Sequence, residues 1–458
     1  MAEMLSDREQ RFARMRNLAR EIFASALKHA SIESAFPRNV HCERRILRIG
    51  EDLHDLDAHN RVFVVSIGKA AHTMVAALAA EVGGSLEGIV ASSVEMTHQV
   101  RGYRYFRGGH PVPNPDSIRS ADAILKSLTS LDAASLAIFM ISGGGSSIVE
   151  KPVATLADDQ VTLPDLVDAY QSLVHCGAPI TEINAIRKHL SAVKGGRLAQ
   201  AAYPAQQVSI LVSDVPEAMP DALASGPTMP DSTSVADCER IAAQYHLVDQ
   251  LPKSVADLFR RHALEETPKS DDPAFVRARW WTVLSNQVAV EGAAAEATRA
   301  GFAVEVDNSC DDWPYDKAAA YLLGRLEQLR RKVSRVCLVS GGEVTVAVRN
   351  GGIGGRNQQF ALACAEHIAG QGITVLSAGT DGIDGNSPAA GAVVDGSTLA
   401  RARKSDERSA SDEFGEQDCV QQALSTFNAF PLFDRLGDAI ITGPTGNNVR
   451  DLRLLLSY

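Results

Sequence analysis

Short glycine-rich segments follow several runs of β-branched residues, and they carry the side chains that could do chemistry. Glycine lets backbone N–H groups come close to an anion, and a helix beginning behind the loop adds partial positive charge, so such segments suit phosphate. The richest of them consists of Ser142, Gly143, Gly144, Gly145, Ser146 and Ser147. Taken singly, each segment could equally be a tight strand-to-helix turn.

Charged residues recur inside these segments, which makes a set of plain turns a weaker explanation. They are Lys69 after Gly68, Asp214 after Ser213, Arg356 and Asn357 after Gly354 and Gly355, and Asp381 within GTDGIDG (379–385). The last segment lacks the spacing of a calcium loop. No Gly-x4-Gly-Lys motif is present, and GIGGRN (352–357) does not complete Gly-x-Gly-x-x-Gly, so neither a P-loop nor a dinucleotide fingerprint is supported.

A basic segment at 183–198 offers a second kind of anion site. Arg187 and Lys194 are seven residues apart, which predicts that both lie on one face of a helix. Gly195 and Gly196 interrupt the helical pattern at a cost of about 1 kcal/mol each, and Arg197 follows them. A solvated basic face is the alternative interpretation, and the segment by itself slightly favours it.

The elements that must position these residues alternate between strands and amphipathic stretches, which predicts an α/β fold with parallel strands. The carboxyl ends of parallel strands meet at one edge, where ligands bind. Between Pro227 and Pro273 no strand is predicted, and the domain boundary is expected there. The expected strands are 61–67, 88–92, 136–141, 208–212, 281–284, 303–306, 336–339, 344–348, 373–376, 392–394 and 439–441.

Composition narrows the function classes. Lysine and arginine number 45 against 56 acidic residues, so the net charge of -11 disfavours binding to nucleic acid or to an anionic membrane. The seven cysteines are scattered without a Cys-x-x-Cys pair, which favours a reducing compartment over a disulfide framework or zinc site. No signal peptide and no apolar run of membrane-spanning length are recognisable, so a cytoplasmic protein is expected.

Read together, the segments resemble the glycerate 2-kinase family, and the match covers nearly the whole chain. The motifs that carry the resemblance, in chain order, are SIGKAA (66–71), GHPVP (109–113), ISGGGSS (141–147), NAIRKHLS (184–191), KGGR (194–197), SDV (213–215), ASGPT (224–228), SGGE (340–343), GGRNQ (354–358), GTDGIDG (379–385) and TGPTG (442–446).

The resemblance implies two α/β domains with the active site in the cleft between them. Residues 1–250 would form a Rossmann-like domain with a parallel sheet flanked by helices, and 251–458 a smaller, mixed-sheet domain of the MOFRL type. It also implies ATP- and Mg²⁺-dependent phosphorylation of the 2-hydroxyl of D-glycerate. D-glycerate and ATP are then the expected partners, without nucleic acid or membrane, and a homodimer is left open.

The resemblance also assigns roles to residues. Lys69 and Arg356 would stabilise the transferred phosphoryl group, since that reaction depends on positioning and charge neutralisation. Asp214 would orient or deprotonate the hydroxyl or hold Mg²⁺, with Asp381 as a second metal candidate. ATP or glycerate would be bound by Ser142, Gly143, Gly144, Gly145, Ser146, Ser147, Arg187, Lys194, Gly195, Arg197, Gly355, Asn357 and Asp381.

Two departures from the family pattern keep other functions in view. Glu217, Ala218 and Met219 stand where relatives usually have Gly-Asp-Asp, and Ser387 and Pro388 replace an expected Asp. A reductase acting on hydroxypyruvate is the first alternative, although no dinucleotide motif follows the early strand. The second is a catalytically silent sensor of sugar acids or nucleotides.

Overall fold

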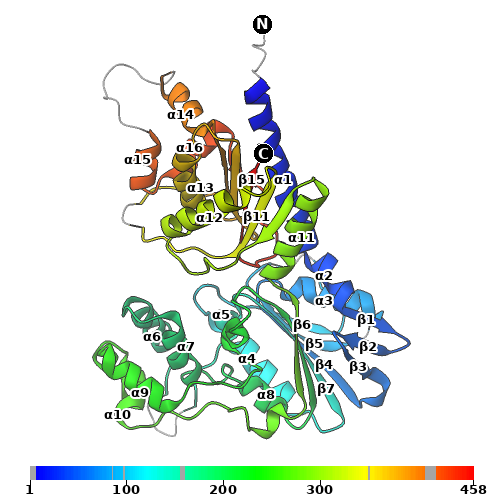
Figure 1. The fold of residues 1–458 in the computed structure, drawn as a ribbon. Coiled ribbons are helices and arrows are strands. Elements are labelled where there is room, and N and C mark those ends of the chain that lie inside the picture. Colours follow the sequence, from blue (N-terminus) through cyan, green and yellow to red (C-terminus); the bar gives the residue numbers. More distant parts are fainter. Residues whose placement is uncertain (1–6, 85, 96–97, 155–159, 349–350, 408–418) are drawn as a thin grey trace. The chain divides into compact units, whose positions relative to one another are not determined.

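The computed structural model describes residues 7–84, 86–95, 98–154, 160–348, 351–407 and 419–458 (Figure 1). The chain forms two compact units: unit 1 comprises Met1–Ser34 and Leu284–Tyr458, and unit 2 comprises Ala35–Val283. This division differs from the expected boundary at residue 250. Strand β9 (Ala278–Leu284) completes the unit 2 sheet, and helix α1 (Asp7–His29) packs on unit 1, so both ends of the sequence belong to unit 1.

Unit 2 is built on a six-stranded sheet in the order β6-β5-β4-β7-β8-β9. The pairings of β6 with β5, β5 with β4, β4 with β7 and β7 with β8 are all parallel. The bounds are β4 (Arg61–Ile67), β5 (Glu87–Ser92), β6 (Tyr103–Arg107), β7 (Ser135–Ser142) and β8 (Gln206–Val212). The carboxyl ends of β4, β7 and β8 therefore lie at one edge of the sheet.

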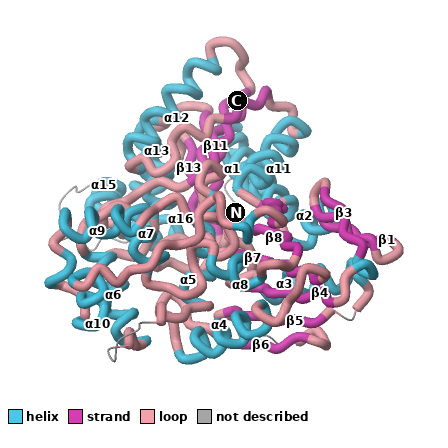
Figure 2. Tube along the Cα trace, turned by 90° about the horizontal axis from the view of Figure 1, so that it is seen from below, coloured by secondary structure: helices cyan, strands magenta, loops and turns pink. Residues whose placement is uncertain are grey.

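Helices cover this sheet and form a separate group beside it. Helix α3 packs on strands of the sheet, while α4 and α8 belong to a core cluster on β4, β5 and β7. Helices α6, α7, α9 and α10 share a second core and lie together in Figure 2. The bounds are α3 (Ala71–Val82), α4 (Pro115–Leu128), α5 (Gly145–Ile148), α6 (Leu163–His175), α7 (Ile180–His189), α8 (Arg197–Ala202), α9 (Val235–Gln244) and α10 (Lys253–Arg260).

Local sequence explains where several of these helices begin. Asn114, Thr162 and Ser234 each accept a hydrogen bond from the backbone N–H three residues later, in capping boxes that start α4, α6 and α9. The remaining elements of this part are α2 (Ile32–Asn39), the antiparallel strands β1 (Val40–Glu43), β2 (Ile46–Ile49) and β3 (Asp52–Asp55), and the 3-10 helices η1 (Leu56–Ala58), η2 (Pro220–Ser225), η3 (Leu247–Asp249) and η4 (Pro273–Phe275).

Unit 1 contains a mixed sheet in the order β10-β11-β15-β12-β13-β14. Among its described strands only β10 and β11 pair in parallel, and β15 is antiparallel to both β11 and β12. The bounds are β10 (Ala303–Val306), β11 (Val336–Gly342), β12 (Ile373–Gly379), β13 (Gly391–Asp395), β14 (Ala439–Ile440) and β15 (Asp451–Ser457). The end of the sequence therefore supplies a central strand.

Helices lie on both faces of the unit 1 sheet (Figure 1). Leu455 joins the core with α12 and α13, whereas Leu454 and Leu456 join the core with α1 and α11, as the alternation of side chains along a strand requires. The bounds are α11 (Asn286–Arg299), α12 (Tyr315–Arg330), α13 (Arg356–His367), α14 (Thr398–Glu407), α15 (Cys419–Ser425) and α16 (Ala429–Leu436).

The α/β class, the parallel first sheet and the mixed second sheet are confirmed. The strand expected at 344–348 is wrong: within it only Thr345 forms an isolated bridge, to Pro314. Alternating valines there line a cavity instead of pairing with a neighbour. Strands β1, β2, β3, β6 and β15 were not predicted.

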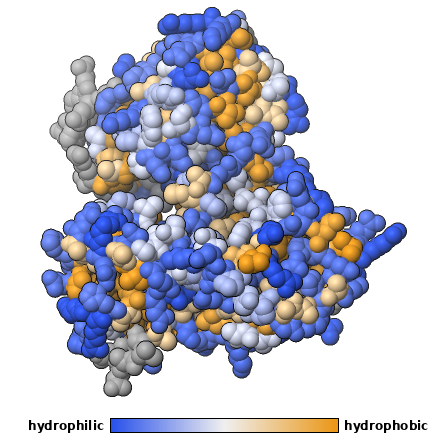
Figure 3. Space-filling view, turned by 60° about the horizontal axis from the view of Figure 1, so that its bottom comes forward, coloured by the Kyte–Doolittle hydropathy of each residue, from blue (hydrophilic) through white to orange (hydrophobic). Residues whose placement is uncertain are grey.

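In Figure 3 hydrophilic residues dominate the visible face, and the apolar patches are separate from one another. None of the described helices is long and apolar enough to cross a membrane. All seven cysteines are described, and none forms a disulfide.

Candidate active site

The loops that follow β4 and β7 are joined by direct hydrogen bonds. The backbone N–H of Lys69 donates to the carbonyl of Gly143 (2.9 Å), and the N–H of Ala70 donates to Ser142 Oγ (3.1 Å). Gly68 has φ +120°, and a Cβ there would stand 2.2 Å from Ser142 Oγ, so only glycine allows this approach. Lys69 therefore lies directly against the Ser142–Ser147 loop.

Asp214, after β8, reaches the same loop. A Cβ on Gly143 would lie 2.0 Å from Asp214 Oδ2, and one on Gly144 would lie 3.2 Å from Lys69 Cγ and 2.9 Å from His110 Cδ2. These glycines therefore let Lys69, Asp214 and His110 crowd around one turn. Burial and then the charge of Lys69 lower the pKa of His110 below its usual value, which favours a neutral imidazole beside the lysine.

Side-chain oxygens of the loop serve mainly to hold it. Ser142 is buried, with Oγ 3.3 Å from the carbonyl of Ile67. Ser146 Oγ lies 2.9 Å from Ser225 Oγ, and Ser147 Oγ donates to the carbonyl of Gly144 (3.3 Å). By contrast, Lys69 is exposed, and its ammonium group makes no hydrogen bond or ion pair with any described residue. Lys69 is therefore a cation open to a ligand.

A cavity of about 400 Å³ opens beside the loop, and we call it the unit 2 cavity. Its walls include apolar residues, loop serines, two histidines, a tyrosine, a glutamine and two cationic side chains, and no described Asp or Glu lines it. The lining residues are His110, Pro111, Val112, Pro113, Gly144, Ser146, Ser147, Val167, Tyr170, Gln171, Val174, His175, Arg187 and Lys194.

Arg187 and Lys194 meet at this cavity, but not in the way that their spacing predicted. Helix α7 ends at His189, and Gly195 and Gly196 adopt φ +54° and +85°, so the expectation of one continuous helix face is wrong. Both cations instead lie over the ring of Tyr170, with the Arg187 guanidinium carbon 4.9 Å and Lys194 Nζ 5.6 Å from its centroid. Gly195 and Gly196 lie beyond Lys194, and their N–H groups donate to the carbonyls of Ser225 and Gly226.

The two cations differ in their partners. Lys194 is buried and ion-paired with the buried carboxylate of Glu150; burial lowers the pKa of Lys194, and Glu150 opposes the shift. Arg187 makes no hydrogen bond or ion pair with a described residue, and its Nε is buried without a partner. Arg197 lies elsewhere: Nη2 donates to the carbonyls of Glu265 and Glu266 (3.3 and 3.4 Å), and the side chain lines another cavity.

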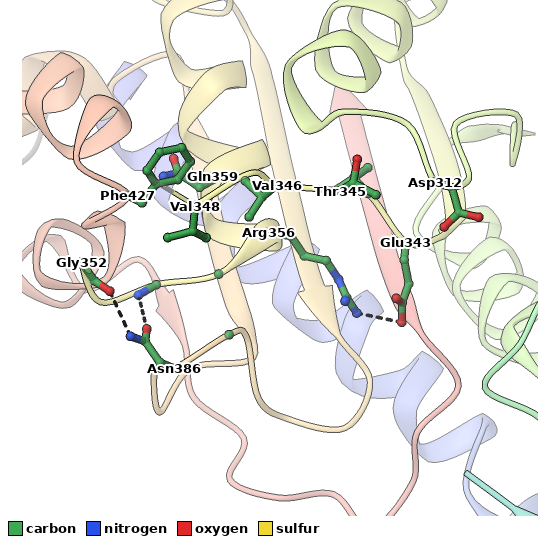
Figure 4. A pocket seen from close by; sticks show the side chains of 14 residues that line it. Asp312, Glu343, Thr345, Val346, Val348, Gly352, Arg356, Gln359, Asn386 and Phe427 are labelled. Carbon is green, nitrogen blue, oxygen red and sulfur yellow. Dashed lines mark hydrogen bonds and ion pairs between the residues drawn. The ribbon is translucent and has the colours of Figure 1, made fainter. Parts of the chain in front are cut away.

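Unit 1 has a cavity of its own, of about 520 Å³, here called the unit 1 cavity. In Figure 4 Val348 and Phe427 lie toward one end, Glu343 and Asp312 toward the other, and Arg356 between them. The full lining is Asp312, Glu343, Val344, Thr345, Val346, Val348, Gly352, Gly354, Gly355, Arg356, Gln359, Gly385, Asn386 and Phe427.

Arg356, at the start of α13, is ion-paired with two carboxylates. Its Nε and Nη2 donate to Asp451 (2.6 and 2.9 Å), and Nη2 also lies 2.8 Å from Glu343 Oε1. Although burial alone would lower it, the pKa of Arg356 is raised by the hydrogen bonds and charge of Asp451 and by Glu343. The unit 1 cavity thus presents an arginine whose charge is already balanced.

The N-terminus of α13, a predicted phosphate site, is occupied by an internal carboxylate. Asp384 accepts the backbone N–H groups of Asn357 (3.0 Å) and Gln358 (2.9 Å), and a Cβ on Gly355 would stand 2.3 Å from Asp384 Oδ1. Asn357 is buried, and Ser377 donates to its side-chain oxygen (2.6 Å). Burial raises the pKa of Asp384 to about 6. Gly355 and Asn357 therefore hold Asp384.

The candidate metal residues lie in different units. Asp214 is half-buried against Gly143, and Asp381 accepts the backbone N–H of Ile383 (3.1 Å). Among the described residues no group of three or more His, Cys, Asp or Glu side chains could hold a metal ion. Asp221, near the Glu217–Met219 departure, accepts a hydrogen bond from Lys188 Nζ (2.8 Å).

Comparison with known proteins now places the chain. A family model described as "Domain of unknown function (DUF4147)" matches residues 18–260, and the "MOFRL family" model matches residues 336–451. The D-glycerate 2-kinase of Thermotoga maritima is 33% identical over 430 residues, covering 92% of this chain and 94% of the relative. This chain belongs to the glycerate 2-kinase family.

Other glycerate kinase relatives agree in fold, though names in the family differ. The crystal structure of glycerate kinase from Thermotoga maritima superposes with a TM-score of 0.81 at 30% identity, covering 97% of this chain and 100% of the other. A protein of Agrobacterium vitis, whose name assigns it provisionally to the hydroxypyruvate reductases, is 35% identical and covers 86% of this chain and 87% of the relative.

Sequence reasoning missed three contributors to these sites. The ring of Tyr170 lies against Arg187 and Lys194, and Glu150 is ion-paired with Lys194 and accepts a hydrogen bond from Tyr170. Neither Tyr170 nor Glu150 stands in a glycine-rich segment. Asp451, the partner of Arg356, opens a strand that was not predicted. An acidic residue just before an apolar run at the end of the chain was the only available signal.

Proposed function

We propose that this chain is an ATP-dependent glycerate 2-kinase that converts D-glycerate and ATP to 2-phosphoglycerate and ADP. Its membership of the family supports the reaction class, and one observation supports the catalytic role of a residue. Lys69 places a cation with no ion-pair partner in the described chain beside the Ser142–Ser147 turn and Asp214. A lysine in that setting can neutralise charge that develops on a transferring phosphoryl group.

Asp214 is the residue of this set that can act on the hydroxyl. A carboxylate accepts hydrogen bonds, so Asp214 would accept the proton of the 2-hydroxyl, orienting the oxygen or removing the proton as the new P–O bond forms. The backbone N–H of Ser146 would donate to an oxyanion, whereas that of Ser147 already donates to the carbonyl of Gly144 (3.3 Å). Arg356 remains our second phosphoryl-stabilising candidate, and it would first have to exchange Glu343 or Asp451 for phosphate.

Asp214 is our first candidate ligand for Mg²⁺. Mg²⁺ in phosphoryl transfer commonly takes one or two protein carboxylates, the other ligands being phosphates and water, so a large cage is unnecessary. Asp214 is half-buried against the turn, and Asp381 is retained as the second candidate. When bound, the ion would neutralise phosphate charge and leave the protein groups to align the hydroxyl.

The remaining predicted binding residues act in this proposal as supports. Lys194 balances Glu150, Gly195 lets the chain turn, and Arg197 fixes the 265–266 segment. Gly355 and Asn357 hold Asp384 at the start of α13. We further propose the cytoplasm as the compartment, which the absence of disulfides supports. Light scattering would test the homodimer that the sequence leaves open.

Product analysis tests the reaction. Wild-type protein is incubated with ATP, Mg²⁺ and D-glycerate, and the product is separated into 2- and 3-phosphoglycerate by chromatography with mass detection. We expect 2-phosphoglycerate and equimolar ADP. Exclusive 3-phosphoglycerate would contradict the assigned position, and absence of turnover with intact binding of both substrates would favour the sensor.

The name of the Agrobacterium relative makes hydroxypyruvate reduction the second candidate function. Incubation with NADH or NADPH and hydroxypyruvate decides it through the absorbance of the reduced nicotinamide. We expect no enzyme-dependent loss of absorbance, since no dinucleotide fingerprint follows β4. Rapid loss would overturn the kinase proposal.

A further inference from the structure

Tyr170 and Lys194, which line the unit 2 cavity, are both joined to a buried carboxylate, Glu150. Glu150 is fully buried and accepts hydrogen bonds from Tyr170 Oη (2.8 Å), Ser191 Oγ (2.5 Å) and the backbone N–H of Lys151 (2.9 Å). Lys194 Nζ completes the set as an ion pair. Four donors on one buried carboxylate hold it in a single orientation, and the charge of Lys194 is cancelled.

Because Glu150 neutralises Lys194, Arg187 is the cation of this cluster without an ion-pair partner among the described residues. Its guanidinium lies on the ring of Tyr170, 4.9 Å from the centroid, and the ring itself is anchored through its hydroxyl to Glu150. Stacking on an aromatic face fixes the plane of a guanidinium without using its N–H groups. An unpaired, partly buried arginine is costly unless a ligand neutralises it. The cluster thus aims a fork of unused donors into the cavity.

The net charge of the cavity favours one kind of ligand. Because Lys194 and Glu150 cancel, Arg187 alone contributes the lysine and arginine charge of the lining. One planar fork matches one carboxylate, through two parallel hydrogen bonds, whereas a nucleotide triphosphate carries several charges and needs several cations. A monocarboxylate therefore fits this cavity better than the phosphates of ATP.

We propose that Tyr170 and Glu150 are positioning residues that present Arg187 to the carboxylate of the hydroxy-acid substrate. The inference rests on the proposed kinase function and deepens it, because it assigns the unit 2 cavity to the acid rather than to the nucleotide. Tyr170 acts through its ring, which carries the guanidinium, and Glu150 acts by fixing the ring and by removing the charge of Lys194 from competition.

Steady-state kinetics with each substrate varied in turn provides the test. Losing a charge-assisted, two-pronged contact costs about 1.5–3 kcal/mol, so Arg187→Lys should raise the KM for D-glycerate about 10- to 100-fold. The KM for ATP should stay within about twofold. Arg240→Lys, an exposed arginine on α9, is the matched control and should change neither constant.

The conservative series at Tyr170 separates positioning from plain stability. Tyr170→Leu removes the platform and should raise the KM for D-glycerate about tenfold, whereas Tyr170→Phe keeps the ring and loses only its hydrogen bond to Glu150, so its KM should lie between those of the wild type and Tyr170→Leu. A merely structural role would lower the amount of active enzyme, and hence the apparent kcat, with both KM values unchanged. An increase confined to the KM for ATP, or no change in Arg187→Lys, would overturn the inference.

Calorimetric titration of D-glycerate alone and of ATP alone keeps this result independent of turnover. If the wild type phosphorylates D-glycerate while Arg187→Lys binds it normally, only the present inference fails. If the wild type shows no kinase activity, the proposed function fails, and loss of D-glycerate binding in Arg187→Lys would still support the carboxylate site. Arg187→Lys preserves the charge and Tyr170→Phe preserves the ring, so both variants should fold. Circular dichroism checks that they do.

Discussion

Arg187 in unit 2 and Arg356 in unit 1 stand in opposite electrostatic situations, although both line a cavity. Arg187 is supported by an aromatic ring and has no carboxylate partner in the described chain, whereas Arg356 binds two carboxylates. The open cation predicts effects on ligand binding with little effect on folding. Substitution of Arg356 should also lower the stability of the fold, because it would leave the buried carboxylate of Asp451 without its ion-pair partner.

Lys69 belongs with Arg187 in this comparison and offers the largest expected effect. Lys69→Ala should lower kcat about 10²- to 10³-fold, the range typical for loss of one donor that stabilises developing charge. Because Lys69 is exposed and unpaired in the described chain, the free energy of unfolding should change by no more than about 0.5 kcal/mol. Turnover assays and urea titration measure the two quantities.

Lys126→Ala, at an exposed position of α4, controls for the loss of a surface lysine. It should match the wild type in both measurements. Near-normal turnover of Lys69→Ala would remove that residue from the mechanism.

Arg356→Ala should lower the free energy of unfolding, unlike Lys69→Ala. Leaving Asp451 buried and unpaired should cost about 3–5 kcal/mol of unfolding free energy, measured by urea titration. The double variant Arg356→Ala with Asp451→Ala should recover part of that stability without recovering turnover. If Arg356→Ala were as stable as the wild type, the ion pairs would not hold this part of unit 1 together.

Asp384 predicts a pH effect that is confined to unit 1. Its pKa in the folded chain, about 6, exceeds the ordinary 3.8, so the folded state favours the protonated form. The stabilising contribution is complete below the ordinary pKa and is lost as the pH rises through about 6, with a slope of at most about 1.4 kcal/mol per pH unit. Asp384→Asn should remove this slope from urea titrations between pH 4 and 7. An identical pH profile in the variant would show that Asp384 does not titrate there.

Glu343 gives the smallest and most discriminating effect. Its ion pair with Arg356 is partly exposed, so Glu343→Gln should change the unfolding free energy by no more than about 1 kcal/mol. A loss as large as that of Arg356→Ala would mean that Glu343, rather than Asp451, is the partner that matters. Urea titration of the two variants side by side settles the point.

Much of unit 2 was predictable because its signals are local. β4 has the predicted bounds, and β7 and β8 extend the predicted runs by a residue or two at their ends, so the turns carrying Lys69, Ser142 and Asp214 were placed correctly. Parallel pairing then brings their carboxyl ends to one edge, without any further information.

The predictions from sequence were wrong where contacts with residues distant in the chain override a local pattern. The valines of 344–348 alternate like a strand, but their side chains line the unit 1 cavity. Arg187 and Lys194 have helical spacing, yet α7 ends at His189, before Lys194, and the two side chains meet on the ring of Tyr170 instead. The strand beginning at Asp451 went unrecognised because two of its seven buried residues, Asp451 and Arg453, are charged, and charged residues are rarely buried without a partner.

The sequence by itself determined which residue types stand at the carboxyl ends of strands, and hence the family and the phosphate chemistry of the loops. Only the tertiary structure decided which cations are open to a ligand. That outcome depends on partners far away in the chain, such as Glu150 for Lys194 and Asp451 for Arg356. The charge that a site presents is the sum over neighbours in space, and the periodicity and glycine patterns of a chain record only neighbours in sequence.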